Sequence, residues 1–141
     1  MTMYIKSLAV AALLAGAGLA QAQLAVIVNP KSPTASMTAD QVAGIYLGKS
    51  NTLPSGAAAA PVDQPESAAV REQFYTKVTG KQAAQVKAAW SRLVFSGKGT
   101  PPKEMANSAD IKKFVAATPD AIAYVEKSAV DASVKVVLSV D

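Results

Sequence analysis

A continuous apolar segment near the start of the chain restricts the folds that this sequence can adopt. Residues 24–28 read Leu-Ala-Val-Ile-Val, and Asn29-Pro30 ends the run. Apolar, β-branched runs of this length without alternation are typical of strands that are covered on both faces. We therefore expect residues 24–28 to form the central strand of a sheet with helices on both sides.

Four amphipathic segments can supply those helices. The predicted helices run from Thr38 to Gly48, from Ser67 to Gly80, over residues 82–95, and from Ser108 to about Pro119. Thr38 and the Gln three residues later match a capping box, and Ser67 and Ser108 are placed to cap their own helices. Trp90 lies on the apolar stripe of the third helix, which favours a place in the core. The predicted inward-facing stripes are Val42, Ile45 and Tyr46; Val70, Phe74 and Val78; Val86, Ala89, Trp90, Leu93 and Val94; and Ile111, Phe114 and Val115.

Three further segments predict strands, over residues 60–63, 121–125 and 134–140. The last of them alternates apolar and polar residues, as a strand with one exposed face does. Residues 49–60 and 96–103 are rich in Gly, Pro and Ser and are predicted to be loops. Strands and helices in this order predict a single α/β layered domain with a mainly parallel sheet.

Residues 1–22 read as a secretory signal peptide. Lys6 precedes an apolar run, Leu8–Leu19, of twelve residues, whereas a membrane span needs about 20. The run leads into Ala20-Gln21-Ala22, the small-x-small pattern of a cleavage site, so we predict cleavage before Gln23. The mature protein, residues 23–141, should be exported to the periplasm and not be embedded in a membrane.

The composition excludes several kinds of chemistry. The 141 residues contain no His and no Cys, so the sequence has no thiol nucleophile, His-based triad, disulfide or Cys/His metal site. We expect no metal and no cofactor. Without Lys6 the formal charge falls from +4 to +3, and the cations are neither clustered nor interleaved with aromatic residues. Nucleic acid is therefore not an expected partner.

The loop over residues 96–103 contains Gly97-Lys98, which invites comparison with a nucleotide-binding loop. That loop requires a Gly five positions before the Gly-Lys pair and a Ser or Thr directly after it. This chain has Arg92 and Gly99 at those positions. The segment is therefore not predicted to bind a nucleotide.

Several motifs, in the same order, resemble the phosphate-binding proteins of phosphate ABC transporters. The first, Met37–Lys49, is similar to that family's leu-thr-x-x-gln-leu…ile-phe-x-gly-lys segment, and Thr118–Val125 is similar to its pro-gly-ala-ile-gly-tyr-val segment. Together the similar motifs span most of residues 24–141. The remaining similar positions are Val26–Pro30, Pro61-Val62, Ser67, Arg71 and Phe74.

The resemblance implies one lobe of a type II periplasmic-binding-protein-like fold. That family builds two lobes around a ligand cleft, and 119 mature residues are too few for both. It further implies a solute-binding-like protein that binds phosphate or another small oxyanion for an ABC-type uptake or sensing system. The implied partners are an ABC permease or an envelope sensor protein.

The ligand loop departs from the family pattern. Where the family has arg-x-x-gly-ser-gly-thr, this chain has Asp63 in place of the arginine, Glu66 and Ala68 in place of the glycines, and Ala69 in place of the threonine. Only Ser67 is retained. Two carboxylates at such a loop would repel an anion, and the bidentate contact of the arginine is lost.

Ser67, Ala68, Ala69 and Arg71 are nevertheless the candidate anion-binding residues. Free backbone N–H groups at a helix start attract anions, and Arg71 lies one turn into the helix. Depending on the loops, Lys49 and Lys98 are further cations that could lie near. The alternative is that Ser67 is an ordinary helix cap and that Arg71 is a surface residue paired with Glu66 or Glu72.

Catalysis by paired carboxylates is a weaker hypothesis. Asp63 with Glu66 or Glu72 could in principle serve as an acid and a base, as in glycoside hydrolysis. Such enzymes need a long cleft with aromatic walls, and the few aromatic residues here fall on predicted core stripes. We therefore predict that the protein is not an enzyme.

Two functions from different classes remain open. The first is binding of phosphate or a related oxyanion. The second is a protein-interaction module of the cell envelope, derived from one lobe of the fold and exposing the former cleft face to a protein partner or to itself. A homodimer could even rebuild a cleft with two lobes.

Overall fold

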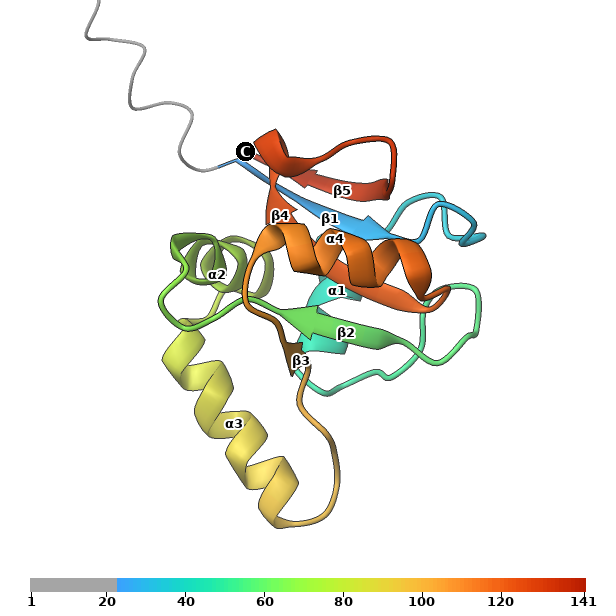
Figure 1. Ribbon diagram of the computed structural model, residues 1–141. Helices are drawn as coiled ribbons and strands as arrows, with labels where there is room; N and C mark the ends of the chain where they lie inside the picture. The colour runs from blue at the N-terminus through green and yellow to red at the C-terminus, as the bar shows by residue number, and fades with distance from the viewer. Residues whose placement is uncertain (1–22) are drawn as a thin grey trace, which may run out of the picture.

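A computed structural model describes residues 23–141, and the predicted signal peptide over residues 1–22 lies outside the described residues. Five strands form one sheet in the order β3-β2-β4-β1-β5 (Figure 1). The four predicted strands are confirmed, with small changes at their ends, whereas β3 was not predicted and begins at the end of a predicted loop. The bounds of the five strands are β1 Leu24–Val28, β2 Ala60–Asp63, β3 Lys103–Glu104, β4 Ala121–Glu126 and β5 Lys135–Val140.

Four of the five strands run in one direction. β2 pairs in parallel with β3 and with β4, whereas β1 is antiparallel to both of its neighbours, β4 and β5. The mainly parallel sheet is confirmed, but β1 is not its central strand. That place belongs to β4, because β5 adds to the outer side of β1. Both β1 and β4 are apolar and buried, so apolarity could not tell them apart.

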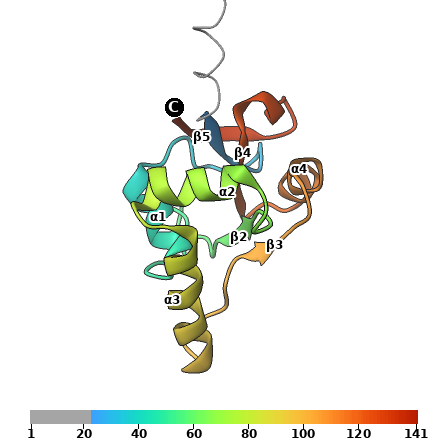
Figure 2. The same cartoon turned by 90° about the vertical axis from the view of Figure 1, so that its left-hand side faces the viewer.

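Helices cover both faces of the sheet (Figure 2). One face carries α1, α2 and the π-helix η3, and the other carries α4. Alternate residues of β1 serve the two cores: Val26 belongs to the first, and Ile27 to the second. The bounds are α1 Ala39–Tyr46, α2 Ala69–Phe74, η3 Tyr75–Thr79, α3 Ala83–Phe95, α4 Ser108–Ala117 and the short 3-10 helix η4 Lys127–Ala129.

The helix caps agree only in part with the prediction. The capping box at Thr38 is formed, with Gln41 as its partner. However, α2 has Ala68 at its N-cap position, with no side-chain hydrogen bond, so Ser67 is not a cap. The N-cap of α4 is Asn107, whose side chain accepts a hydrogen bond of 2.8 Å from the backbone N–H of Asp110, so Ser108 is not a cap either. In both cases an adjacent residue takes the extended cap conformation.

The helix α3 projects away from the layered body (Figures 1 and 2). Val86 is its only fully buried residue. Val94, assigned to the inward stripe, is 49% exposed, and the neighbouring Phe95 is 93% exposed. The stripe is therefore at least partly covered as far as Trp90 and Leu93, and the last residues of the helix are exposed. Among residues 23–141, no helix is long and apolar enough to cross a membrane.

Candidate functional site

The charged centre of the molecule lies where β2 and β3 end. Asp63 is the last residue of β2, Glu104 is the last residue of β3, and the two are paired in register. Helix α2 follows β2 and brings Arg71 to the same place, within ion-pair distance of both carboxylates. In open α/β sheets, ligands bind beyond the carboxyl ends of parallel strands. This centre is therefore the candidate functional site.

Asp63 is buried, and protein donors occupy its carboxylate. The hydroxyl of Tyr75 donates a hydrogen bond of 2.6 Å to Oδ2, and the hydroxyl of Tyr124 donates to Oδ1. The backbone N–H of Gln64 donates a further bond of 2.8 Å to Oδ1. Buried charges are tolerated only when they are paired and hydrogen-bonded in this way. Asp63 thus acts as the acceptor at the centre of an internal network.

The tyrosines of this network are held in the neutral form. Burial, and next to it the negative charge of Asp63, raise the pKa of Tyr75 and of Tyr124 far above the ordinary value. Burial raises the pKa of Tyr46 in the same way. Each hydroxyl therefore keeps its proton at physiological pH. Tyr75 and Tyr124 serve as hydrogen-bond donors to Asp63.

Arg71 is buried rather than solvated, with 8% of its surface exposed. Its Nη1 donates to the backbone oxygen of Gln64 at 2.9 Å and to Glu104 at 3.2 Å, and its Nη2 lies 3.8 Å from Asp63. Burial alone would lower the pKa of Arg71, but the attraction of Asp63 raises it, so the guanidinium stays charged. The alternative that Arg71 is a surface residue is wrong, because its side chain is buried at the ends of β2 and β3.

The two glutamates considered as partners of Arg71 bond to other groups. Glu66 is paired with Lys87 at 2.6 Å, and this pair is exposed on both sides. That contact lowers the pKa of Glu66. Glu72 accepts hydrogen bonds from the hydroxyl of Thr76 and from the backbone N–H of Ala83. Neither glutamate is brought together with Asp63 as an acid and base pair.

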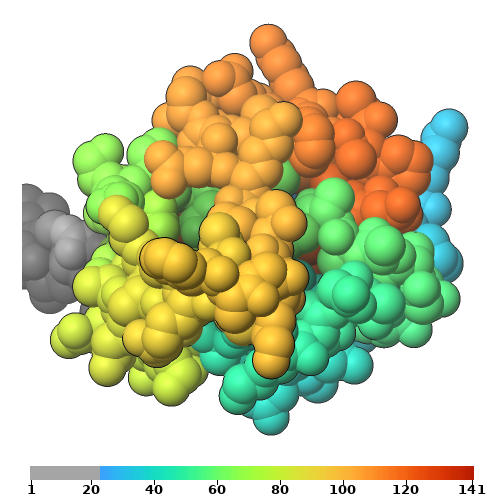
Figure 3. Space-filling model, turned by 90° about the horizontal axis from the view of Figure 1, so that it is seen from below, coloured from blue at the N-terminus to red at the C-terminus, as the bar shows by residue number. Residues whose placement is uncertain are grey.

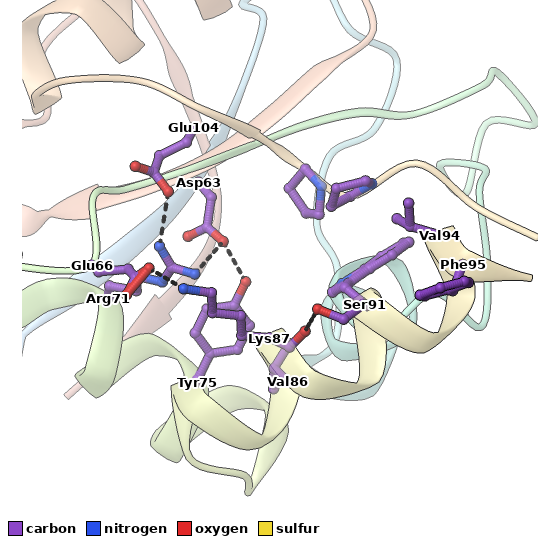
Figure 4. A pocket seen from close by; sticks show the side chains of 13 residues that line it. Asp63, Glu66, Arg71, Tyr75, Val86, Lys87, Ser91, Val94, Phe95 and Glu104 are labelled. Atoms are coloured by element: carbon purple, nitrogen blue, oxygen red, sulfur yellow. Dashed lines mark hydrogen bonds and ion pairs between the residues drawn. The ribbon is translucent and has the colours of Figure 1, made fainter. Parts of the chain in front are cut away.

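A cavity of about 520 Å³ opens over this network (Figure 4). Its charged residues are three carboxylates and two cations, so it carries one net negative charge. Ring and aliphatic side chains form the opposite wall. Pockets for small organic ligands have volumes of about 300–1,000 Å³, so this cavity is large enough for an organic group. The lining residues are Asp63, Glu66, Arg71, Tyr75, Val86, Lys87, Trp90, Ser91, Val94, Phe95, Pro101, Pro102 and Glu104.

Trp90 joins α3 to the body of the protein. Its indole N–H donates to the backbone oxygen of Tyr46 at 2.8 Å, and its ring packs against the core, which confirms the predicted core position. The same ring also borders the cavity. Gly48, in the left-handed conformation with φ of 79°, allows this approach, because a Cβ there would lie 2.9 Å from Leu93.

The structure places the four candidate anion-binding residues at different exposures. Ser67 is exposed in a turn, Ala68 is partly buried and Ala69 is exposed. The N–H of Ala68 donates to the backbone oxygen of Pro65 at 3.0 Å, so it is not free. Of the four candidate residues, only Arg71 lines the cavity. Lys49 and Lys98 border a separate cavity next to Trp90.

Sequence reasoning did not assign Tyr75, Tyr124 and Glu104 to the site. A signal for Tyr124 was present, because a tyrosine inside a strand expected to be buried must place its hydroxyl on a buried acceptor. Asp63, at the end of another buried strand, is that acceptor. No sequence signal marked Glu104, because β3 consists of two exposed residues whose pairing with β2 is long-range.

The fold is that of one lobe of an α/β solute-binding-like fold, and solved structures similar to this chain include proteins named for phosphate transport. It is similar to a putative phosphate ABC transporter substrate-binding protein with bound phosphate from Clostridium perfringens, with 24% identity and a TM-score of 0.66 over 81% of this chain and 43% of that one. It is also similar to an ABC-type phosphate transport receptor from Vibrio cholerae, with 20% identity and a TM-score of 0.64 over 81% and 44% of the two chains. It is similar as well to PstS from Borrelia burgdorferi, with 12% identity and a TM-score of 0.61 over 81% of this chain and 46% of that one.

These similarities establish the fold. The chain spans less than half the length of the solved structures that it matches. No protein-family model matches the sequence, and no curated protein matches it.

Proposed function

We propose that the protein is an exported, non-enzymatic, solute-binding-like protein of the periplasm that acts as an interaction module rather than as a phosphate carrier. In this proposal, the face formed by α3 and the cavity over Asp63 and Arg71 binds a protein partner. The leader over residues 1–22 directs the chain to the periplasm, where an envelope protein can reach this face.

The observation that carries the proposal is the commitment of Arg71 to internal partners. Asp63 and Glu104 together outweigh its charge, and Gln64 accepts one of its hydrogen bonds. A phosphate ion entering the cavity would meet a net negative charge, and it would have to compete with two carboxylates for one guanidinium. The apolar wall, by contrast, fits the side chains of a protein partner.

Binding of a small oxyanion for an ABC-type uptake or sensing system is the second candidate function. One observation favours it: Nε of Arg71 is buried and has no hydrogen-bond partner among residues 23–141. An oxygen of phosphate or a related anion would satisfy this donor. An ABC permease or an envelope sensor would then be the partner.

Thermal unfolding of the mature protein distinguishes the two functions. Phosphate, sulfate and chloride are compared at millimolar concentration and constant ionic strength. An interaction module should respond alike to all three salts. Phosphate binding at about 100 times the dissociation constant adds about 2.7 kcal/mol, which raises the midpoint by roughly 10 °C for a domain of this size. A rise of that kind with phosphate alone would overturn the proposal.

Site-specific photo-crosslinking tests for the protein partner. A photo-reactive residue replaces Phe95, which is 93% exposed, in cells that produce the full-length chain. The matched control places the same residue at Ser55, which is exposed and does not line the cavity over Arg71. We expect a crosslinked adduct from position 95 and none from position 55. Adducts from neither position, or equally from both, contradict the proposed face.

A further inference from the structure

The outer end of α3 is an apolar ridge with no partner within residues 23–141. Val94 is 49% exposed and Phe95 is 93% exposed. Both lie beyond Trp90, the residue that joins the helix to the body. Scattered apolar residues on a surface are ordinary, whereas contiguous exposed apolar patches mark interaction sites. We call these two residues the α3 ridge.

The α3 ridge borders the cavity over Asp63 and Arg71. Val94 and Phe95 form part of one wall, and Pro101 and Pro102 from the following loop add to the apolar lining (Figure 4). Seen from below, α3 and that loop form one continuous face of the molecule (Figure 3). In a two-fold symmetric contact, each copy presents the same surface to the other. The α3 ridge and the cavity lie on one face, so each copy could insert its ridge into the cavity of the other.

This face carries a basic segment next to a cavity with a net negative charge. The segment over residues 91–103 contains three cations, Arg92, Lys98 and Lys103, and no carboxylate. Among residues 23–141, neither Arg92 nor Lys98 takes part in an ion pair. The cavity beside it carries a net negative charge, and the side chains of Glu66 and Glu104 are 60% and 55% exposed, although each also pairs with a cation of its own chain. A copy turned by a two-fold rotation brings the basic segment of one chain to the acidic rim of the other.

The place of the cavity in the sheet supports the same face. The cavity lies beyond the carboxyl ends of β2 and β3, where α/β sheets place their ligand crevice.

We propose that the partner at this face is a second copy of the same chain, docked so that Phe95 of each copy enters the cavity of the other. This inference rests on the proposed interaction function and names its partner. The apolar surfaces of the α3 ridge and the cavity wall supply the attraction. Arg92 and Lys98, facing Glu66 and Glu104 of the other copy, fix the orientation.

Analytical ultracentrifugation of the processed protein, purified after export, tests this dimer. We expect a monomer–dimer equilibrium between about 1 µM and about 1 mM. Phe95→Asp should raise the dissociation constant about tenfold or more, because it places a charge in the apolar contact. Ser55→Asp adds the same charge on an exposed loop and should leave the dissociation constant of the dimer unchanged. Since Phe95 contacts little of its own chain, its variant should keep the thermal midpoint of the wild type.

Charge reversal provides the second arm. Arg92→Glu should weaken the dimer several-fold at low salt, and the difference should shrink at high salt because exposed charges are screened. A protein that stays monomeric throughout the concentration range overturns the inference. So does a dimer that is indifferent to Phe95→Asp. A crosslink from position 95 to a different protein, without any dimer, overturns this inference but leaves the proposed interaction function standing.

Discussion

Two amphipathic segments of similar periodicity have different fates in this protein. The segment formed by α2 and η3 buries Val70, Phe74 and Val78, the three residues of its predicted stripe. In α3, only Val86 is fully buried. The periodicity identified the apolar face of both segments correctly. It carried no information on whether another element of the chain would cover that face, because coverage is decided by long-range packing.

Replacing a phenylalanine by alanine in each of the two segments should give the largest difference in the free energy of unfolding. Phe74 is fully buried and stacks on Tyr124 with ring centroids 3.9 Å apart. We expect Phe74→Ala to lower the free energy of unfolding by about 3–5 kcal/mol. Phe95→Ala in α3 should change it by less than about 0.5 kcal/mol. Urea denaturation followed by circular dichroism measures both. Equal losses would show that α3 is covered as well as α2.

The charged network beneath α2 should be the next most sensitive place. Asp63→Asn keeps the shape of the side chain but removes the charge that faces Arg71 and the two tyrosine hydroxyls. We expect a loss of about 2–3 kcal/mol in the free energy of unfolding, since hydrogen bonds to a buried charge are weakened. Asp120→Asn, at an exposed turn, is the matched control and should stay within about 0.5 kcal/mol. An unchanged urea midpoint for Asp63→Asn would contradict the network.

Attachment of α3 through Trp90 should contribute less. Trp90→Phe keeps an aromatic ring but removes the indole N–H that donates to Tyr46. Loss of this single neutral hydrogen bond should lower the free energy of unfolding by about 1 kcal/mol. Ser91→Ala, one residue further along an exposed part of α3, should have almost no effect. If the two variants behave alike in urea denaturation, Trp90 does not hold α3.

The smallest expected effect concerns alkaline pH. Burial and the charge of Asp63 raise the pKa of Tyr75 above its ordinary value of 10.0. The unfolded chain therefore loses this proton near pH 10 while the folded chain keeps it. The stabilisation is complete below that pH and is lost as the pH rises further. Between pH 9 and 10.5, the free energy of unfolding should fall by about 1 kcal/mol more in the wild type than in Tyr75→Phe. If the free energy of unfolding falls equally with pH in the wild type and in Tyr75→Phe, Tyr75 is not buried in the network.

Comparison of two buried residues shows how far the sequence could predict the site. Asp63 was assigned to the candidate loop through the resemblance to phosphate-binding proteins, in the place of that family's arginine. Arg71 was a candidate anion-binding residue, and the alternative, a surface residue paired with Glu66 or Glu72, gave neither its burial nor its partners. Its carboxylate partner Glu104 lies 33 residues further along the chain, on a strand too short for any local pattern to reveal. The sequence therefore placed Asp63 and Arg71 at the candidate site, but it did not predict which residues they pair with.

The sequence by itself determined the α/β class, the positions of the apolar strands and the apolar face of each helix. These features depend on local periodicity and on the composition of short segments. The tertiary structure decided that β4 is central and that β1 runs against the other strands. It also buried Asp63 and Arg71 together at the ends of β2 and β3 and left the outer end of α3 exposed. Such outcomes depend on contacts between residues distant in the chain, for which no local pattern exists.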